Sequence, residues 1–114
     1  MTLLIELTQH DDFWKLALAG ELDYSECTAF RMNIDRVLKA APAATVVDLS
    51  KLEYMDSSGL GLLLSLSKEY TSQGGRLVLV TNETVDNILS LTRLTGIFST
   101  AADEGEAREL LAEA

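Results

Sequence analysis

One stretch, residues 45–64, constrains the fold more than any other part of this sequence. It opens with the apolar, β-branched run TVV at 45–47, which is typical of a buried strand. An acidic segment at 48–54 is predicted to be a turn, and the sequence MDSSG at 55–59 then leads directly into a leucine-rich run. The stretch therefore predicts a strand, a loop and the start of a helix.

Polar side chains mark the start of this helix. Asp and Ser accept hydrogen bonds from the free N–H groups of a first helical turn, so either Asp56 or Ser57 is expected to be the N-cap. Ser58 then lies in the first turn, with its hydroxyl near the positive end of the helix dipole. A well-capped strand-to-helix turn with no further role is the alternative interpretation.

Two features of the helix favour a functional role. Gly59 and Gly61 follow the cap, where each costs about 1 kcal/mol relative to Ala, which predicts that something approaches the backbone closely. Residues 60–66 also contain five leucines, too many for a helix with one solvated face. We therefore expect part of this surface to meet a partner.

The remaining sequence alternates between predicted strands and helices. Residues 3–7 and 13–19 alternate in polarity on either side of a polar turn, which predicts an antiparallel hairpin. Further strands are expected at 77–81 and 96–100, and helices at about 25–39, 57–73, 83–94 and 102–114. The order ββαβαβαβα predicts a single α/β domain over residues 1–114, with a mixed, mostly parallel sheet, an N-terminal hairpin and about four helices.

Composition limits the classes of partner and the cellular compartment expected for this chain. The chain has 18 Asp and Glu against 9 Lys and Arg, a formal net charge of −9, which argues against nucleic acid and suits either a partner with a basic face or simple solubility. A single cysteine, Cys27, fits a reducing compartment and is expected to be a small buried hydrophobe on a helix. Since the sequence shows neither a signal peptide nor a membrane-length apolar run, we expect a cytoplasmic protein with no membrane partner.

No group of side chains predicts catalysis, a cofactor or a metal. The motif G-x-S-x-G is absent, and the only histidine, His10, falls in the predicted hairpin turn. One Cys and one His cannot build a zinc site, and Gly59-x-Gly61 lacks the lysine of a phosphate-binding loop. A receiver-type carboxylate site from residues 11–12 and Asp48 is disfavoured, because a strand, and not a helix, follows residue 12.

Two spaced motifs resemble those of the STAS domain family. Residues 46–50 (VVDLS) followed by 55–61 (MDSSGLG) resemble its signature, and the box GELD at 20–23 is also similar. The likeness extends over nearly the whole chain, including GGRLVLV at 74–80 and residues 91–98. More narrowly, the chain resembles the bacterial anti-sigma-factor antagonists.

This resemblance implies an interaction switched by phosphorylation. The unmodified antagonist would bind an anti-sigma factor that is also an ATP-dependent serine kinase, which releases a sigma factor. The kinase would phosphorylate the serine that matches Ser58, and a metal-dependent serine phosphatase would reverse this; Ser57 is a competing acceptor. Near a helix N-terminus the phosphoryl group is expected to leave the fold intact and to disturb a docked partner.

The resemblance also implies which residues surround the acceptor. Asp56, Ser57 and Gly59 would complete its loop, and Asp23 matches the acidic residue of the first box. The expected partner-binding residues lie in the two motifs or on the following helix: Asp23, Asp56, Ser57, Gly59, Leu60, Gly61, Leu22 and Leu64. For the three leucines, packing in the core is the alternative.

The segment YSEC at 24–27 departs from the small and apolar residues expected after the first box, and we expect it to shape the choice of partner. An alternative function is that of a non-switched STAS subunit in a stress-signalling or lipid-transport complex. The identity of the kinase, sigma factor and signal, the oligomeric state and nucleotide binding stay open.

Overall fold

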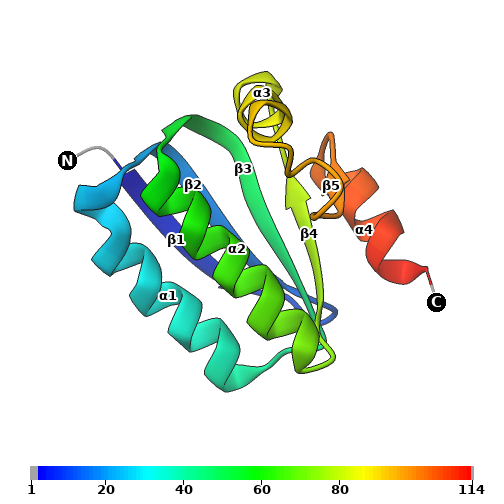
Figure 1. Ribbon diagram of the computed structural model, residues 1–114. Coiled ribbons are helices and arrows are strands. Elements are labelled where there is room, and N and C mark those ends of the chain that lie inside the picture. Colours follow the sequence, from blue (N-terminus) through cyan, green and yellow to red (C-terminus); the bar gives the residue numbers. More distant parts are fainter. Residues whose placement is uncertain (1–2, 114) are drawn as a thin grey trace.

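The computed structural model describes residues 3–113, which form a five-stranded sheet in the order β1-β2-β3-β4-β5 (Figure 1). The strands are β1 (Leu3–Gln9), β2 (Trp14–Leu22), β3 (Ala44–Met55), β4 (Arg76–Val80) and β5 (Thr100–Ala101). β1 and β2 form an antiparallel hairpin, and all later neighbours are parallel. The predicted α/β class, with a mixed and mostly parallel sheet, is confirmed.

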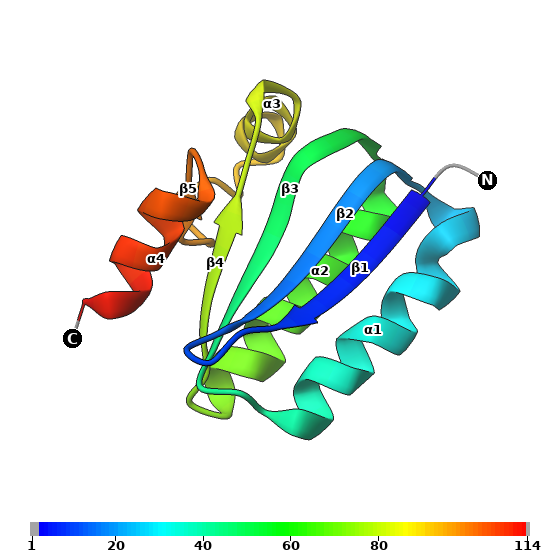
Figure 2. The ribbon, with the colours of Figure 1, turned by 180° about the vertical axis from the view of Figure 1, so that it is seen from behind.

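Four α-helices connect or follow these strands: α1 (Cys27–Ala40), α2 (Ser57–Ser72), α3 (Glu83–Leu91) and α4 (Glu104–Ala112), and a 3₁₀ turn (Tyr24–Glu26) precedes α1. α1 and α2 lie side by side on one face of the sheet and run in the same direction (Figure 1). α4 packs on the other face against β3, β4 and β5. The β1 and β2 strands are left open on that face (Figure 2).

The buried side chains form two clusters, one on each face of the sheet. In β4, Leu77 and Leu79 belong to the larger cluster, which α1 and α2 cover, whereas Val78 and Val80 belong to the smaller cluster under α4. This division explains why β4 is apolar throughout, since a strand covered on both faces has no solvated side. β4 is therefore a strand that is covered on both faces.

The segment 48–54, predicted to be a turn, is instead the second half of β3. Every third residue is buried there, namely Leu49, Leu52 and Met55. The two residues between each successive pair are exposed. The register against β2 shifts twice in this region, between Ala17 and Ala19 and between Gly20 and Glu21. Such irregularities turn the strand, and a spacing of three matches neither the strand period nor the helix period.

The predicted ends of several elements also need correction. The last strand is only Thr100–Ala101, not 96–100, and α3 ends at Leu91, shortly before Arg93 adopts a positive φ of 61°. α4 is confined to Glu104–Ala112, with Ala107 fully buried and Leu110 and Leu111 half-buried. The predicted end of that helix, residue 114, lies outside the described residues. Within residues 3–113, no helix combines the length and apolar character needed to cross a membrane.

Candidate functional site

Asp56 connects the two sequence motifs and begins α2. Its Oδ1 atom accepts hydrogen bonds from the backbone N–H groups of Ser58 (2.9 Å) and Gly59 (3.1 Å), so Asp56, and not Ser57, is the N-cap. Its Oδ2 atom accepts a hydrogen bond from Tyr24 N (3.0 Å), and its own N–H donates to Leu22 O (3.1 Å). Through its backbone and its carboxylate, Asp56 therefore holds the end of β2 and the residues that follow it against the start of α2.

Asp23 organises the neighbouring start of α1 in a similar way. As the N-cap of the 3₁₀ turn it accepts hydrogen bonds from Ser25 N (3.0 Å) and from the Ser25 hydroxyl. The thiol of Cys27 donates to Asp23 O (3.4 Å). The two predicted acidic residues thus fix the adjacent starts of two helices, and both helices begin at the same end of the molecule (Figure 1).

The two glycines of the motif have different surroundings. A Cβ atom on Gly59 would lie 2.5 Å from Leu22 Cγ and 2.8 Å from Leu22 O, so the close approach predicted there comes from this chain's own β2. A Cβ atom on Gly61 would meet nothing within 4 Å. Gly59 is accordingly buried, whereas Gly61 is exposed on the surface of α2.

Ser58 lies on the wall of a surface depression between α1 and α2. Ser57 is exposed outside this depression, and Ser58 is half-buried within it. The depression has a volume of about 480 Å³ and is lined by Tyr24, Cys27, Thr28, Arg31, Met32, Ser58 and Leu62. Since Ser58 is the second residue of α2, its side chain lies beside the start of that helix.

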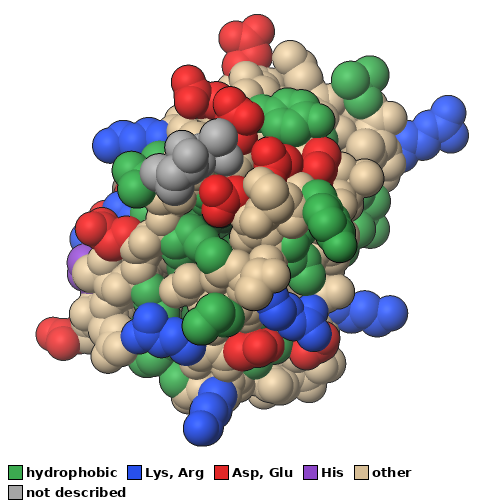
Figure 3. Space-filling view, turned by 90° about the vertical axis from the view of Figure 1, so that its left-hand side faces the viewer, with side chains coloured by type: hydrophobic (Ala, Val, Ile, Leu, Met, Phe, Trp, Pro, Cys, Tyr) green, Lys and Arg blue, Asp and Glu red, His purple; other side chains and the backbone are tan. Residues whose placement is uncertain are grey.

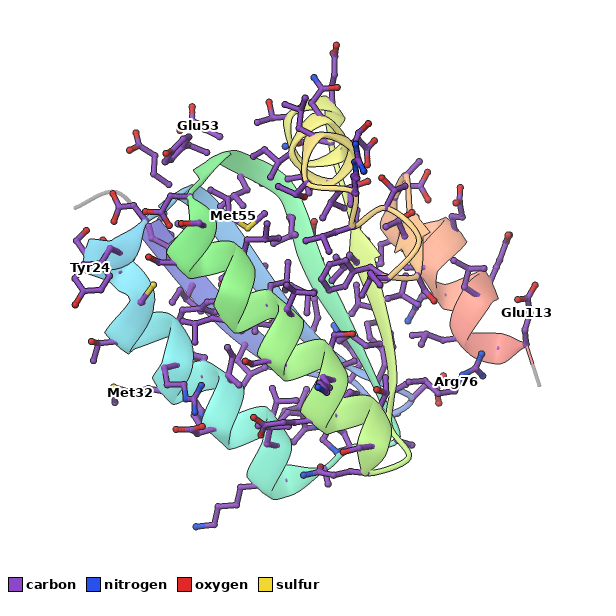
Figure 4. All side chains as sticks on the ribbon, in the orientation of Figure 1. Tyr24, Met32, Glu53, Met55, Arg76 and Glu113 are labelled. Carbon is purple, nitrogen blue, oxygen red and sulfur yellow. The ribbon has the colours of Figure 1, made fainter. Side chains whose placement is uncertain are left out.

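Apolar side chains border the depression. Tyr24 and Met32 are 79% and 64% exposed. Figure 4 shows Tyr24 near the start of α1 and Met32 further along this helix, both at the outer edge of the molecule. Large exposed apolar side chains of these two types are common where proteins bind each other. Sequence reasoning missed both residues, and the available signal is position: Tyr24 directly precedes α1, and Met32 is four residues after Thr28, on a helix face that does not meet the core.

Two leucines expected at a docking surface are in the core instead. Leu22 has no exposed surface and Leu60 is 7% exposed, so the prediction that they face a partner is wrong for this structure. Leu22 fills the space left by Gly59, and Leu60 packs in the cluster beneath α2. Leu64 is half-buried and packs against the same cluster.

Cys27 is half-buried and lines the depression, which corrects its predicted place in the core. Burial raises the pKa of the Cys27 thiol, and the nearby negative charges of Asp56 and Asp23 raise it further. The thiol therefore stays protonated at neutral pH and is a poor nucleophile. Figure 3 shows Asp and Glu side chains gathered with hydrophobic ones in the upper part of the face that it presents.

The other residues considered for chemistry have structural partners. The His10 ring stacks on Phe13, with 4.7 Å between ring centroids, and the backbone N–H of His10 donates to Phe13 O within the hairpin turn. Asp48 lies 3.5 Å from Lys15 Nζ, and Lys15 Nζ lies 2.7 Å from Glu104. In the part of the chain that the structure describes, no three His, Cys, Asp or Glu side chains are grouped as metal ligands would be.

The fold and site together define a small α/β domain with a capped helix start beside an apolar surface depression. Residues 5–107 match the family model of the STAS domain, and the chain belongs to that family. Among its relatives, the anti-sigma F factor antagonist of Paenibacillus polymyxa is 32% identical over 96 residues, which is 82% of each chain.

Solved structures agree with this family. An anti-sigma factor antagonist from Mycobacterium paratuberculosis superposes with a TM-score of 0.88 at 23% identity, covering 98% of this chain and 96% of that one, which shows a shared fold. The antagonist SpoIIAA is similar in its unphosphorylated form (TM-score 0.77, 26% identity, 95% and 96% coverage). Its phosphorylated form from Bacillus is also similar (0.72, 25%, 95% and 99%).

Proposed function

We propose that this protein is an anti-sigma factor antagonist whose binding is switched off by phosphorylation of Ser58. The observation that carries the proposal is the position of Ser58, in the first turn of α2 and on the wall of an apolar surface depression. The relative from Paenibacillus polymyxa is named as such an antagonist, and SpoIIAA is known in a phosphorylated and an unphosphorylated form. Both support the proposal.

The domain itself tolerates the modification. A phosphoryl group adds about −1.5 to −2 charges, and the N-terminal end of a helix is a favourable place for negative charge. Ser58 is not among the buried core residues, so the group requires no repacking of either cluster. The phosphorylated protein therefore keeps the fold of the unmodified one.

A docked partner does not tolerate a phosphoryl group on Ser58. A partner that covers Tyr24, Met32 and Leu62 removes water from the depression, and a doubly charged group left there without water is strongly unfavourable. Asp23 and Asp56 lie at the same helix starts and add negative charge. The partner surface is expected to be basic, since the chain carries a net charge of −9.

The partner is an anti-sigma factor with serine kinase activity, and a serine phosphatase restores the binding form; this part rests on the family resemblance. Ser58 is favoured over Ser57 as acceptor because Ser58 lines the depression, whereas Ser57 does not. Asp23, Asp56, Ser57, Gly59, Gly61 and Leu64 form or flank the loop and helix next to this surface.

Incubation with ATP and candidate kinases from the same genome neighbourhood tests the proposal. We expect a mass gain of one phosphoryl group that peptide mapping places on Ser58, present in Ser57→Ala and absent in Ser58→Ala. Ser58→Ala should still bind the kinase, and Ser58→Asp should fold normally but bind at least about tenfold more weakly, equivalent to about 1.4 kcal/mol. If no kinase modifies the chain and Ser58→Asp binds as well as the parent, the domain is a non-switched interaction module.

A further inference from the structure

We propose that Arg31 receives the phosphoryl group of Ser58, and that this ion pair closes the depression between α1 and α2 in the modified protein. The inference rests on the proposed function in one respect, the phosphorylation of Ser58. It adds a second way in which the modification removes the docking surface. Charge alone repels a partner, whereas an Arg31 side chain drawn across the depression also covers the surface that the partner needs.

Two of the backbone amides that ordinarily hold an anion at a helix start are already occupied. Both Ser58 N and Gly59 N donate to Asp56 Oδ1, at 2.9 and 3.1 Å. Asp56 is also tied to Tyr24 N, so displacing its carboxylate would separate the starts of the two helices. A phosphoryl group on Ser58 therefore does not gain these two amides, and a side chain that lines the depression is the other source of a donor.

Arg31 is the one cationic residue among those that line the depression with Ser58. α1 and α2 run side by side in the same direction, so Ser58 lies near the level at which α1 begins (Figures 1 and 4). The Cα–Cβ bonds of an α-helix tilt toward its N-terminus, so an Arg31 side chain released from Asp35 extends along α1 toward Ser58. The long arginine side chain suits this reach, and its planar guanidinium suits a phosphate.

The ion pair that Arg31 forms in the structure is weak. Arg31 Nε lies 3.6 Å from Asp35 Oδ1, one turn further along α1, and the two side chains are 50% and 63% exposed. Exposed pairs of this type contribute little, whereas guanidinium and phosphate form strong paired hydrogen bonds. The acidic groups near Ser58, Asp23 and Asp56, repel the phosphate and direct it away from the loop, toward α1.

The test uses protein with phosphoserine incorporated genetically at position 58, so that no kinase is required. Phosphorus NMR titration measures the second pKa of the phosphate, which is about 6 in a free phosphoserine. We expect this pKa to be lower in the parent than in Arg31→Gln, because the guanidinium stabilises the dianion. Arg31→Lys should restore part of the difference, and Arg36→Gln, which alters an exposed arginine outside the depression, should leave the pKa at the parental value.

A second measurement follows the Arg31 Nε–H resonance, which should shift between unmodified and phosphorylated protein, while that of Arg36 stays in place. Equal phosphate pKa values in the parent and Arg31→Gln, with an unmoved Arg31 resonance, would overturn the inference. That result is distinct from failure of the proposed function, which would be seen as unweakened binding of Ser58→Asp to the kinase.

Discussion

Asp56 joins segments that are 32 residues apart, through hydrogen bonds from Tyr24 on one side and from Ser58 and Gly59 on the other. The same carboxylate caps α2 and holds the segment that precedes α1. The position of Ser58 relative to the depression therefore depends in part on this side chain. The acidic residue next to the proposed phosphorylation site therefore has a structural role that is independent of any partner.

Replacing Asp56 with Ala should lower the free energy of unfolding by about 1–3 kcal/mol, because a helix cap and a long-range hydrogen bond are lost together. Urea unfolding measures the change. Asp35→Ala is the matched control, since Asp35 is exposed and has a weak pairing with Arg31 within α1; its effect should stay within about 0.5 kcal/mol. Equal effects of the two substitutions would contradict the structural role of Asp56.

Gly59 and Gly61 should respond in opposite directions to the same substitution. Gly59→Ala places a methyl group 2.5 Å from Leu22 Cγ and should destabilise the protein by about 1–3 kcal/mol. Gly61→Ala meets no atom within 4 Å and should stabilise the exposed surface of α2 by up to about 1 kcal/mol. Thermal unfolding of the two variants checks the signs, and a stabilising Gly59→Ala would show that Leu22 can move aside.

At the level of elements, Arg76 holds the C-terminal end of α4. The guanidinium of Arg76, at the start of β4, donates to the carbonyl oxygens of Leu111 (2.6 Å), Leu110 (2.8 Å) and Glu113. Figure 4 shows Arg76 and Glu113 next to each other at the end of this helix. Because the last carbonyls of a helix lack partners within it, a cation there satisfies them and interacts well with the helix dipole.

Arg76→Met should therefore loosen the C-terminal half of α4 and lower stability by about 0.5–1.5 kcal/mol. Amide hydrogen exchange is the suitable measurement, with faster exchange expected in α4 and little change in α1. Arg36→Met, which removes an exposed arginine from the surface of α1, should leave α4 unaffected. If exchange in α4 is the same in Arg76→Met as in the parent, packing of Ala107 on the sheet is sufficient to hold the helix.

At the level of the whole molecule, Lys15 connects the N-terminal hairpin with the C-terminal helix. Its Nζ atom lies 2.7 Å from Glu104 at the start of α4 and 3.5 Å from Asp48 of β3. The hydrogen bond with Glu104 raises the pKa of Lys15, against a smaller opposite effect of burial, and the same bond lowers the pKa of Glu104. Burial works against ionisation of Asp48, but hydrogen bonds with Ser50 and the charge of Lys15 leave its pKa below the ordinary value.

These shifts determine how stability depends on pH. A carboxyl group whose pKa is lowered in the folded state stabilises the protein at every pH above its unfolded pKa. For Glu104 the unfolded pKa is the ordinary 4.5. The contribution is lost as the pH falls through the lower pKa of the folded state. Glu104→Gln should reduce stability at pH 7 by about 0.2–1 kcal/mol, as expected for a partly exposed pair, and the difference should vanish in acid. Urea unfolding across this range measures it; a difference that persists in acid would indicate lost packing.

Much of this molecule is specified locally. The order of strands and helices, the hairpin, the covered β4 strand and the capped start of α2 follow from polarity periods and capping residues, and these act within a few positions along the chain. The place of Ser58 in the first turn of α2 follows in the same way. The acidic residues Asp23 and Asp56 were found from the two motifs alone.

Other features depend on contacts between distant segments. The second half of β3 is a strand because β2 pairs with it through two register shifts, and its own spacing of buried residues matches no regular period. Leu22 lies inward because the absence of a side chain at Gly59 lets β2 approach α2, and Leu60 lies on the face of α2 that packs in the core. Only the packing of α1 beside α2 brings Arg31 and Met32 to the depression that Ser58 lines, since a surface shared by two helices is not encoded in either one.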